Sequence, residues 1–164
     1  MKLAKRTLAL VLAVMMLAAV MVVPASAASG YESRFREFRQ ISVADVGAHP
    51  GYTKALQKFL CVYSSYYKTL IEGAGGIDGI FGPKTGDVVG YYQTAKGIKK
   101  DGICGPNTWE KIASDLIPDE SDQASYRVYL KRGEERVYYV FTYGTYIYSI
   151  YIDGEGAIQF HPEA

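Results

Sequence analysis

The sequence is poor in the residues that usually perform chemistry. Its 164 residues include two histidines, two cysteines and one tryptophan. Neither His49 nor His161 belongs to the H-x-x-x-H or H-E-x-x-H spacing of a zinc site. The G-x-S-x-G motif of serine hydrolases is also absent. We therefore expect a protein that is not an enzyme and that has no metal site and no cofactor.

Long apolar runs are absent except at the start of the chain. Three basic residues precede a wholly apolar stretch over residues 8–23, and residues 24–27 (PASA) end in an A-x-A pattern. This order predicts a secretory signal peptide over residues 1–27. An uncleaved N-terminal anchor is the alternative. No later stretch could span a bilayer, so no membrane contact is expected after cleavage.

The chain also has no large excess of basic over acidic residues or the reverse. Without residues 1–27 the chain keeps 15 basic and 17 acidic residues, which is a net charge of −2. A basic surface for nucleic acid is therefore not indicated. Secretion would place Cys61 and Cys104 in an oxidising environment, where we expect them to form a disulfide. Two unpaired buried thiols are the alternative.

Helical periodicity is clear in the first half of the remaining chain. Apolar residues recur every three or four positions over residues 52–71, as in an amphipathic helix, and a glycine-rich stretch at residues 73–76 ends the pattern. Two more helices are expected over residues 83–96 and 106–116, because each begins with a proline, the residue best tolerated at a first helical position.

After residue 117 the period changes to two. Short antiparallel strands are predicted over residues 126–132, 136–143, 146–152 and 157–161. So small a sheet needs a cover for its apolar face, and we expect the helices or a partner to supply it. The predicted fold class is α+β, with a small closed three-helix bundle followed by an antiparallel β-meander of three to four strands. The expected boundaries are a signal peptide (1–27), an N-terminal extension (28–50), the bundle (51–117), a linker (118–125) and the meander (126–164).

One turn motif occurs twice in the chain. Residues 77–85 read IDGIFGPKT and residues 100–108 read KDGICGPNT. In each copy the aspartate can accept backbone N–H groups, and the glycine after it tolerates a positive φ. The isoleucines Ile80 and Ile103 are expected to point into the core. Each copy has one aspartate, too few for a calcium loop, so the turn is interpreted mainly as scaffold.

These motifs, in their order, resemble the peptidoglycan-binding domain built from three helices. The matching elements are L-Q-x-x-L at residues 56–60, the first turn, V-V-x-x-Y-Q at residues 88–93, and D-G-I-C-G-P-N-T-W at residues 101–109. The resemblance covers about residues 51–116. It implies core positions for Phe81, Tyr92 and Trp109. It also implies a ligand groove near the repeated turns, with these candidate binding residues: Asp78, Tyr91, Asp101 and Asn107.

Gly86 and Gly90 depart from the family pattern. They lie four residues apart, so they form one smooth strip on the second helix. The strip could allow close approach of a neighbouring element or of a ligand. The alternative is that the glycines reflect sequence drift and have no special role, in a helix that is held by its packing.

Tyrosine is abundant, with fifteen residues in all. In the predicted meander Tyr139 and Phe141 share one face, opposite Tyr138, and Tyr148 lies opposite Tyr151. One face could be buried while the other forms an aromatic platform for sugar rings or for a protein. The preference of tyrosine for strands is the alternative explanation.

Together these features predict a secreted, non-catalytic, cell-wall-associated protein that binds peptidoglycan, through its glycan or its stem peptide. Another cell-envelope protein is a possible second partner. The alternative function is a secreted protein-interaction module that uses the bundle as scaffold and the tyrosine-rich meander as a docking surface. A small hydrolase is a third and remoter alternative.

Overall fold

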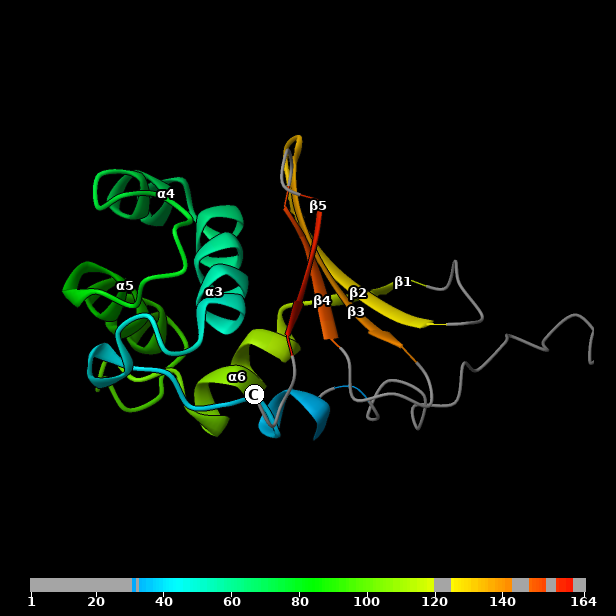
Figure 1. Ribbon diagram of the computed structural model, residues 1–164, viewed down its shortest axis with the longest axis horizontal. Helices are drawn as coiled ribbons and strands as arrows, with labels where there is room; N and C mark the ends of the chain where they lie inside the picture. Colours follow the sequence, from blue (N-terminus) through cyan, green and yellow to red (C-terminus); the bar gives the residue numbers. More distant parts are fainter. Residues whose placement is uncertain (1–30, 32, 120–124, 143–147, 153–155, 161–164) are drawn as a thin grey trace, which may run out of the picture. The chain divides into compact units, whose positions relative to one another are not determined.

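The computed structural model describes residues 31, 33–119, 125–142, 148–152 and 156–160, which all lie within one compact unit, Tyr31–Ala164 (Figure 1). The expected signal peptide and parts of three predicted strands, including His161, lie outside the described residues. Within the described part of the chain, no helix has both the length and the apolar character needed to cross a membrane.

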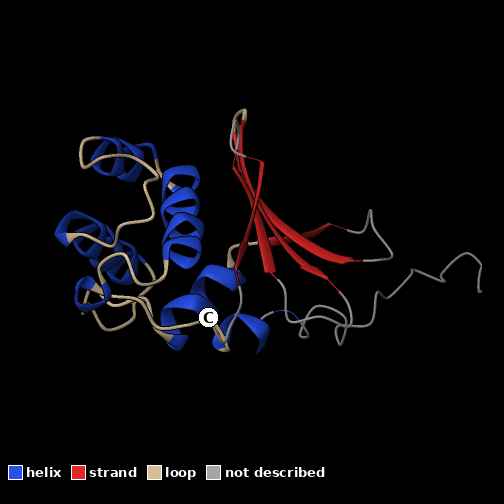
Figure 2. Cartoon of the chain, viewed as in Figure 1, coloured by secondary structure: helices blue, strands red, loops and turns tan. Residues whose placement is uncertain are grey.

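The helices, which lie to one side of the sheet in Figure 2, precede it in the chain. They include a short helical segment over residues 33–36, the 3-10 helix η1 (Val43–Asp45) and the α-helices α3 (Pro50–Tyr63), α4 (Ser65–Glu72), α5 (Pro83–Ala95) and α6 (Pro106–Ser114). The expected single helix over residues 52–71 is wrong, because Ser64 is extended and divides it into α3 and α4. The periodicity concealed the break, since Tyr63 and Tyr67 still stack across it with ring centroids 5.9 Å apart.

The sheet has five antiparallel strands in sequential order: β1 (Ile117–Asp119), β2 (Ser125–Arg132), β3 (Glu135–Thr142), β4 (Tyr148–Ile152) and β5 (Gly156–Phe160). The α+β class is confirmed, but the count of three to four strands is wrong. The additional strand is β1, which overlaps the expected linker and pairs with β2 through Ile117 opposite Tyr129. It is short and contains Pro118, which an edge strand tolerates, so no alternating pattern revealed it.

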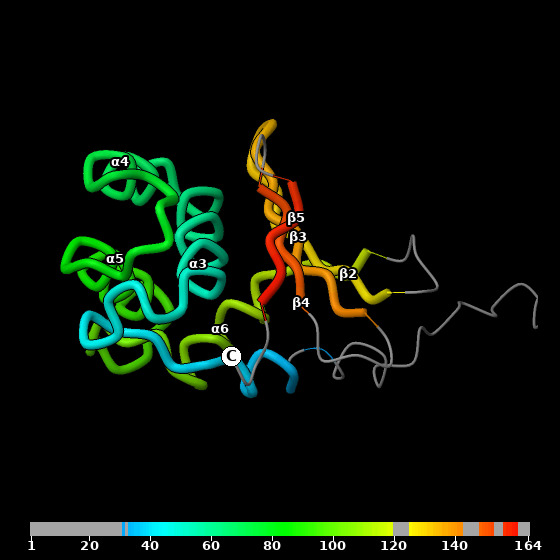
Figure 3. The backbone as a smooth tube through the Cα atoms, in the orientation of Figure 1, coloured from blue at the N-terminus to red at the C-terminus, as the bar shows by residue number. Residues whose placement is uncertain are grey.

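The helices cover one face of the sheet, as expected. Helix α3 contacts α4 and α5 on one side and β2, β3 and β5 on the other (Figures 1 and 3). The hydroxyl of Tyr139 on β3 donates to the backbone carbonyl of Ala55 on α3 over 2.9 Å. The sheet residues that point toward the helices are buried, and they include Val128, Val137, Phe141, Tyr148 and Ile150.

Phe38 lies at the centre of an aromatic core shared by the helices and the sheet. Its ring centroid is 5.1–6.2 Å from those of five other aromatic residues: Tyr52, Trp109, Phe141, Tyr148 and Phe160. Phe35 packs beside it and contacts Tyr139 at 5.1 Å. Both phenylalanines come from the expected N-terminal extension, so this segment is part of the core. Tyr92, Trp109 and Phe81 are buried as predicted.

The predicted disulfide is wrong for this structure, in which Cys61 and Cys104 are free, buried thiols. The backbone of Cys104 pairs with Ile41 in both directions, at 3.0 and 3.1 Å. Cys61 lies on α3 within the electrostatic reach of Glu72 and Glu135, in a different environment. Spacing in the sequence could not reveal whether the two thiols lie within bridging distance.

Truncation of Phe38 tests the shared core. We expect Phe38→Ala to lower the free energy of unfolding by about 3–5 kcal/mol, because a buried phenylalanine leaves a cavity among packed rings. Urea denaturation followed by circular dichroism measures the change. Glu37→Ala is the control, since Glu37 is exposed on the same segment. Equal losses in the two variants would contradict the assignment of Phe38 to the core.

The buried thiols predict a pH dependence of stability. Burial raises the pKa of Cys61 from 9.0 to about 11, and that of Cys104 well above 9.0. Their contribution to stability is therefore present below pH 9 and is lost as the pH rises toward 11, where the unfolded chain ionises and the folded one does not. Urea titrations across this range should show the loss, and Cys61→Ala should lessen it.

Thiol titration tests the free state of the two cysteines. It should find two thiols after denaturation, and finding none would show that the disulfide forms.

Candidate functional site

A glutamine on α3 holds the first copy of the repeated turn. The Nε2 group of Gln57 donates to Asp78 Oδ1 over 2.8 Å and to the carbonyl of Ile80 over 3.2 Å. Its Oε1 atom accepts the N–H of Gly79 over 3.0 Å. The Asp78 carboxylate also accepts the N–H of Ile80, as an Asx turn requires. Asp78 therefore shapes the turn.

Gln93 on α5 holds the second copy in the same way. Its Nε2 group donates to Asp101 Oδ1 over 2.8 Å and to the Ile103 carbonyl over 2.9 Å, and it also reaches Thr108 Oγ1 over 3.0 Å. Its Oε1 atom accepts the N–H groups of Asp101 and Gly102, both over 2.9 Å. The two motifs are thus one structural device used twice.

The prediction that the turn isoleucines point into the core is wrong. Ile80 is 47% exposed and Ile103 is half-buried, whereas the following residues, Phe81 and Cys104, are almost fully buried. The N–H of each isoleucine bonds to the aspartate two positions earlier. The core-facing side chain is therefore the next residue along.

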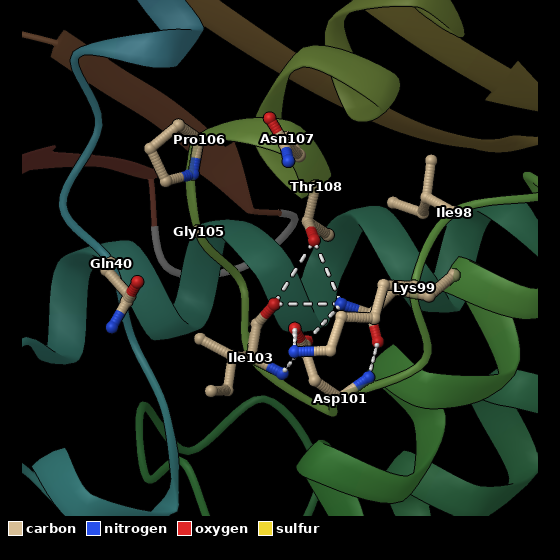
Figure 4. Close-up of a pocket in the computed structure, with 10 residues that line it drawn as sticks. Gln40, Ile98, Lys99, Asp101, Ile103, Gly105, Pro106, Asn107 and Thr108 are labelled. Carbon is tan, nitrogen blue, oxygen red and sulfur yellow. Dashed lines mark hydrogen bonds and ion pairs between the residues drawn. The ribbon is translucent and has the colours of Figure 1, made fainter.

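A pocket of about 290 Å³ lies against the second turn (Figure 4). Its lining comes from three segments of the chain: Gln40, Gln93, Ile98, Lys99, Asp101, Ile103, Gly105, Pro106, Asn107 and Thr108. Gly105 lets the Gln40 side chain approach closely, because a Cβ at this position would lie 3.1 Å from Gln40 Oε1. Gln40 and Asn107 are exposed at the pocket, and neither has a dashed contact to the other residues drawn in Figure 4.

The first turn has a smaller counterpart of about 190 Å³, lined by residues that include Asp78, Pro83 and Lys84. Lys84 occupies the position equivalent to Asn107, and its Nζ atom lies 3.9 Å from Asp87 Oδ2. The lining of this pocket includes no residue from the N-terminal segment. The two turns therefore share a frame but present different chemistry.

Asp101 stays ionised in the pocket at the second turn. Partial burial raises the pKa of its carboxyl, but hydrogen bonds from the Gln93 amide and the Ile103 N–H, together with the nearby Lys99 ammonium, outweigh burial and lower the pKa overall. Lys99 Nζ lies 3.7 Å from Asp101 Oδ2 and is otherwise open to solvent. The pocket thus carries the negative charge of Asp101, which is held by hydrogen bonds, beside the positive charge of the exposed Lys99 side chain.

The glycine strip on α5 gives close approach to the second turn. Gly102 has a φ of +69°, and a Cβ there would lie 3.1 Å from the Gly86 carbonyl oxygen. The stem of Lys100 packs over Gly90, where a Cβ would meet its Cε at 3.1 Å. A shallow hollow of about 440 Å³ remains along the strip. The structure therefore shows that the strip lets a neighbouring element, the second turn, approach α5 closely.

The structure brings only two of the four predicted site residues together. Asp101 and Asn107 line the same pocket, whereas Asp78 lies at the first turn. Tyr91 is 40% exposed, as expected, with the Lys100 ammonium 5.2 Å from its ring centroid. Among the pocket residues, sequence reasoning missed Lys99 and, above all, Gln40. Its segment showed no clear pattern and reaches the second turn only through the fold.

The chain does contain one S-x-x-K spacing, at Ser65 and Lys68, which some acyl-transfer enzymes use. Lys68 is ion-paired with Glu135 and lies 3.6 Å from Glu72 Oε1. Its hydrogen bond with Glu135 raises the pKa of its ammonium, whereas a general base needs a lowered pKa. This pair therefore serves to join α4 to β3. Among the described residues, no group of three or more His, Cys, Asp or Glu side chains could hold a metal ion.

The set of hydrogen bonds by which Gln57 or Gln93 holds a turn is called a glutamine clamp. Substitution of Gln93 tests the clamp of the second turn. We expect Gln93→Ala to cost about 2–4 kcal/mol of unfolding free energy, because several buried partners would lose their hydrogen bonds. Thr94→Ala is the matched control: Thr94 is the adjacent, exposed residue, and its hydroxyl bonds only to Gly90 of its own helix. Urea denaturation of both variants measures the difference. Similar losses would show that the clamp is not required.

Comparison with known proteins finds a family match for part of the chain. Residues 52–112 match the family described as "Putative peptidoglycan binding domain". A protein of Kitasatospora aureofaciens, named "Uncharacterized protein in bpoA1 3'region", is 48% identical over 46 residues, which cover 28% of this chain and 39% of that protein. The matched stretch is thus about two-fifths of the relative's length. No solved structure matches the chain. The resemblance seen in the motifs is confirmed: residues 52–112, which contain both glutamine-held turns, match the peptidoglycan-binding domain family.

Proposed function

We propose that the protein is secreted and binds peptidoglycan, without catalysis, through the pocket of the second turn. The family match supports peptidoglycan as the ligand. The observation that selects the second turn is the pair of exposed amide side chains, Gln40 and Asn107, at a pocket whose other polar groups are already engaged.

The ligand offers groups that fit this pocket. Peptidoglycan carries N-acetyl groups on its sugars, and amides and carboxylates on its stem peptides. A side-chain amide both donates and accepts hydrogen bonds, so Asn107 and Gln40 can pair with an amide of the ligand. Lys99 can turn from Asp101 to a ligand carboxylate, since its side chain is 86% exposed. Asp101 would repel such a carboxylate directly, and its part is to hold the turn.

A secreted location follows from the same proposal. The N-terminal pattern of residues 1–27 is that of a signal peptide, and cell-wall peptidoglycan lies outside the cytoplasm. The match is to a binding domain and supports adhesion to the wall as the protein's contribution.

A pull-down with purified peptidoglycan sacculi tests the proposal. The protein should sediment with sacculi at low salt. Asn107→Ala should weaken binding by up to about tenfold, the expected cost of one lost hydrogen-bonding group. Lys84→Ala, at the equivalent position of the first turn, is the matched control and should bind normally.

The outcomes separate the alternatives. Wild-type protein that stays in the supernatant would exclude peptidoglycan binding and favour the protein-interaction module. Equal weakening by Asn107→Ala and Lys84→Ala would move the site away from the second turn. A loss of turbidity of the sacculus suspension would indicate hydrolysis, contrary to the non-catalytic assignment.

A further inference from the structure

The outer face of the sheet carries a row of tyrosines. Tyr129 on β2 lies opposite Tyr138 on β3, and Tyr138 lies opposite Tyr151 on β4. Residues that alternate with them, such as Tyr139, point to the helices. The three tyrosines therefore cross the sheet in one line on the face away from α3. We call Tyr129, Tyr138 and Tyr151 the tyrosine row.

The row is exposed and held in place. Tyr151 is 48% exposed, and Tyr129 and Tyr138 are half-buried, with ring centroids 5.7 Å apart. Arg136 Nη1 donates to the hydroxyl of Tyr138 over 3.3 Å. Ile117, opposite Tyr129 on β1, is 52% exposed and extends the row by one strand. The result is a narrow line of flat apolar surfaces with hydroxyl groups.

Two cations face each other beside this row. Lys131 on β2 lies directly opposite Arg136 on β3, and both are exposed. Like charges in opposed positions destabilise a β-ladder. Within the described residues neither side chain forms a salt bridge, although Glu134 in the adjoining turn gives Arg136 a partial counter-charge. An anionic partner bound at this place would relieve the repulsion.

We propose that the tyrosine row is a second binding surface, for a peptidoglycan glycan strand, with Lys131 and Arg136 binding carboxylates of the attached stem peptides. The ring centroids of Tyr129 and Tyr138 lie 5.7 Å apart, which is comparable to the length of one sugar in an extended chain. Successive tyrosines can thus stack on successive sugars. The proposal rests on the proposed function for the identity of the polymer.

The shape of the surface favours a linear polymer over a folded protein. On one side of the row lie Arg127, Val140, Ser149 and Gln159, and on the other lie Lys131 and Arg136. Among the described residues, the aromatic surface is therefore a single residue wide. A stable protein interface needs about 800 Å² from each partner, with a broad apolar centre.

Two surfaces on one folded unit would strengthen wall binding. When the bundle pocket is occupied, the tyrosine row is held close to the same polymer network, so its binding becomes effectively intramolecular. Removing either surface should then weaken binding to sacculi, and removing both should weaken it further.

Substitution of the central tyrosine tests the proposal with the full protein. We expect Tyr138→Ala to weaken binding to sacculi about fivefold to tenfold, as for a central aromatic contact. It should also weaken binding to soluble N-acetylglucosamine oligosaccharides, measured by titration calorimetry. Lys131→Ala should weaken sacculus binding only, because these oligosaccharides carry no carboxylate. Gln159→Ala, exposed on the same face, is the control and should change neither.

Each outcome decides one point. If the wild type binds sacculi and Tyr138→Ala binds both ligands as well as Gln159→Ala does, the row is not a glycan site, and the bundle pocket is unaffected. If the wild type binds neither ligand, the proposed function itself fails. If Tyr138→Ala keeps glycan binding but abolishes self-association in sedimentation, the row is an interface between copies of the chain, which overturns the proposal.

Discussion

The aromatic core around Phe38 is the interaction on which the rest of the structure depends. A meander of this size is marginal on its own, and the bundle leaves Tyr52 and Trp109 to be covered. Phe38 contacts both of these residues and also Phe141, Tyr148 and Phe160 of the sheet. The N-terminal segment therefore joins bundle and sheet into one unit, and any surface on one part is fixed relative to the other.

The glutamine clamps explain how one sequence motif gives two different pockets. Gln57 and Gln93 satisfy the backbone of each turn, so the turns keep one shape while the surrounding residues vary. The first turn presents Lys84, and the second presents Asn107 together with Gln40 from the N-terminal segment. The repeated motif gives both turns the same backbone frame. The side chains that the fold places around each turn make their chemistry different.

Local patterns predicted the elements that depend on local chemistry. Proline at Pro83 and Pro106 began α5 and α6 as expected, and the alternation after residue 125 gave the strands. Patterns failed where tertiary contacts decide: the break at Ser64, the short strand β1, and the inward side chains of the turns. In the site, Asp101 and Asn107 were predicted together by the family resemblance. Gln40 could not be predicted, since its segment reaches the second turn only through tertiary contacts. These are the packing of Phe38 on Trp109 and the backbone pairing of Ile41 with Cys104.

The most direct test of the account is a chemical-shift titration of the isotope-labelled protein with soluble peptidoglycan fragments. Because the account places the bundle's ligand at the second turn, the amide and side-chain resonances of residues 98–108 and of Gln40 should shift with increasing ligand. The equivalent residues 77–85 of the first turn should remain unchanged. Shifts confined to the first turn, or no shifts in either turn, would contradict it.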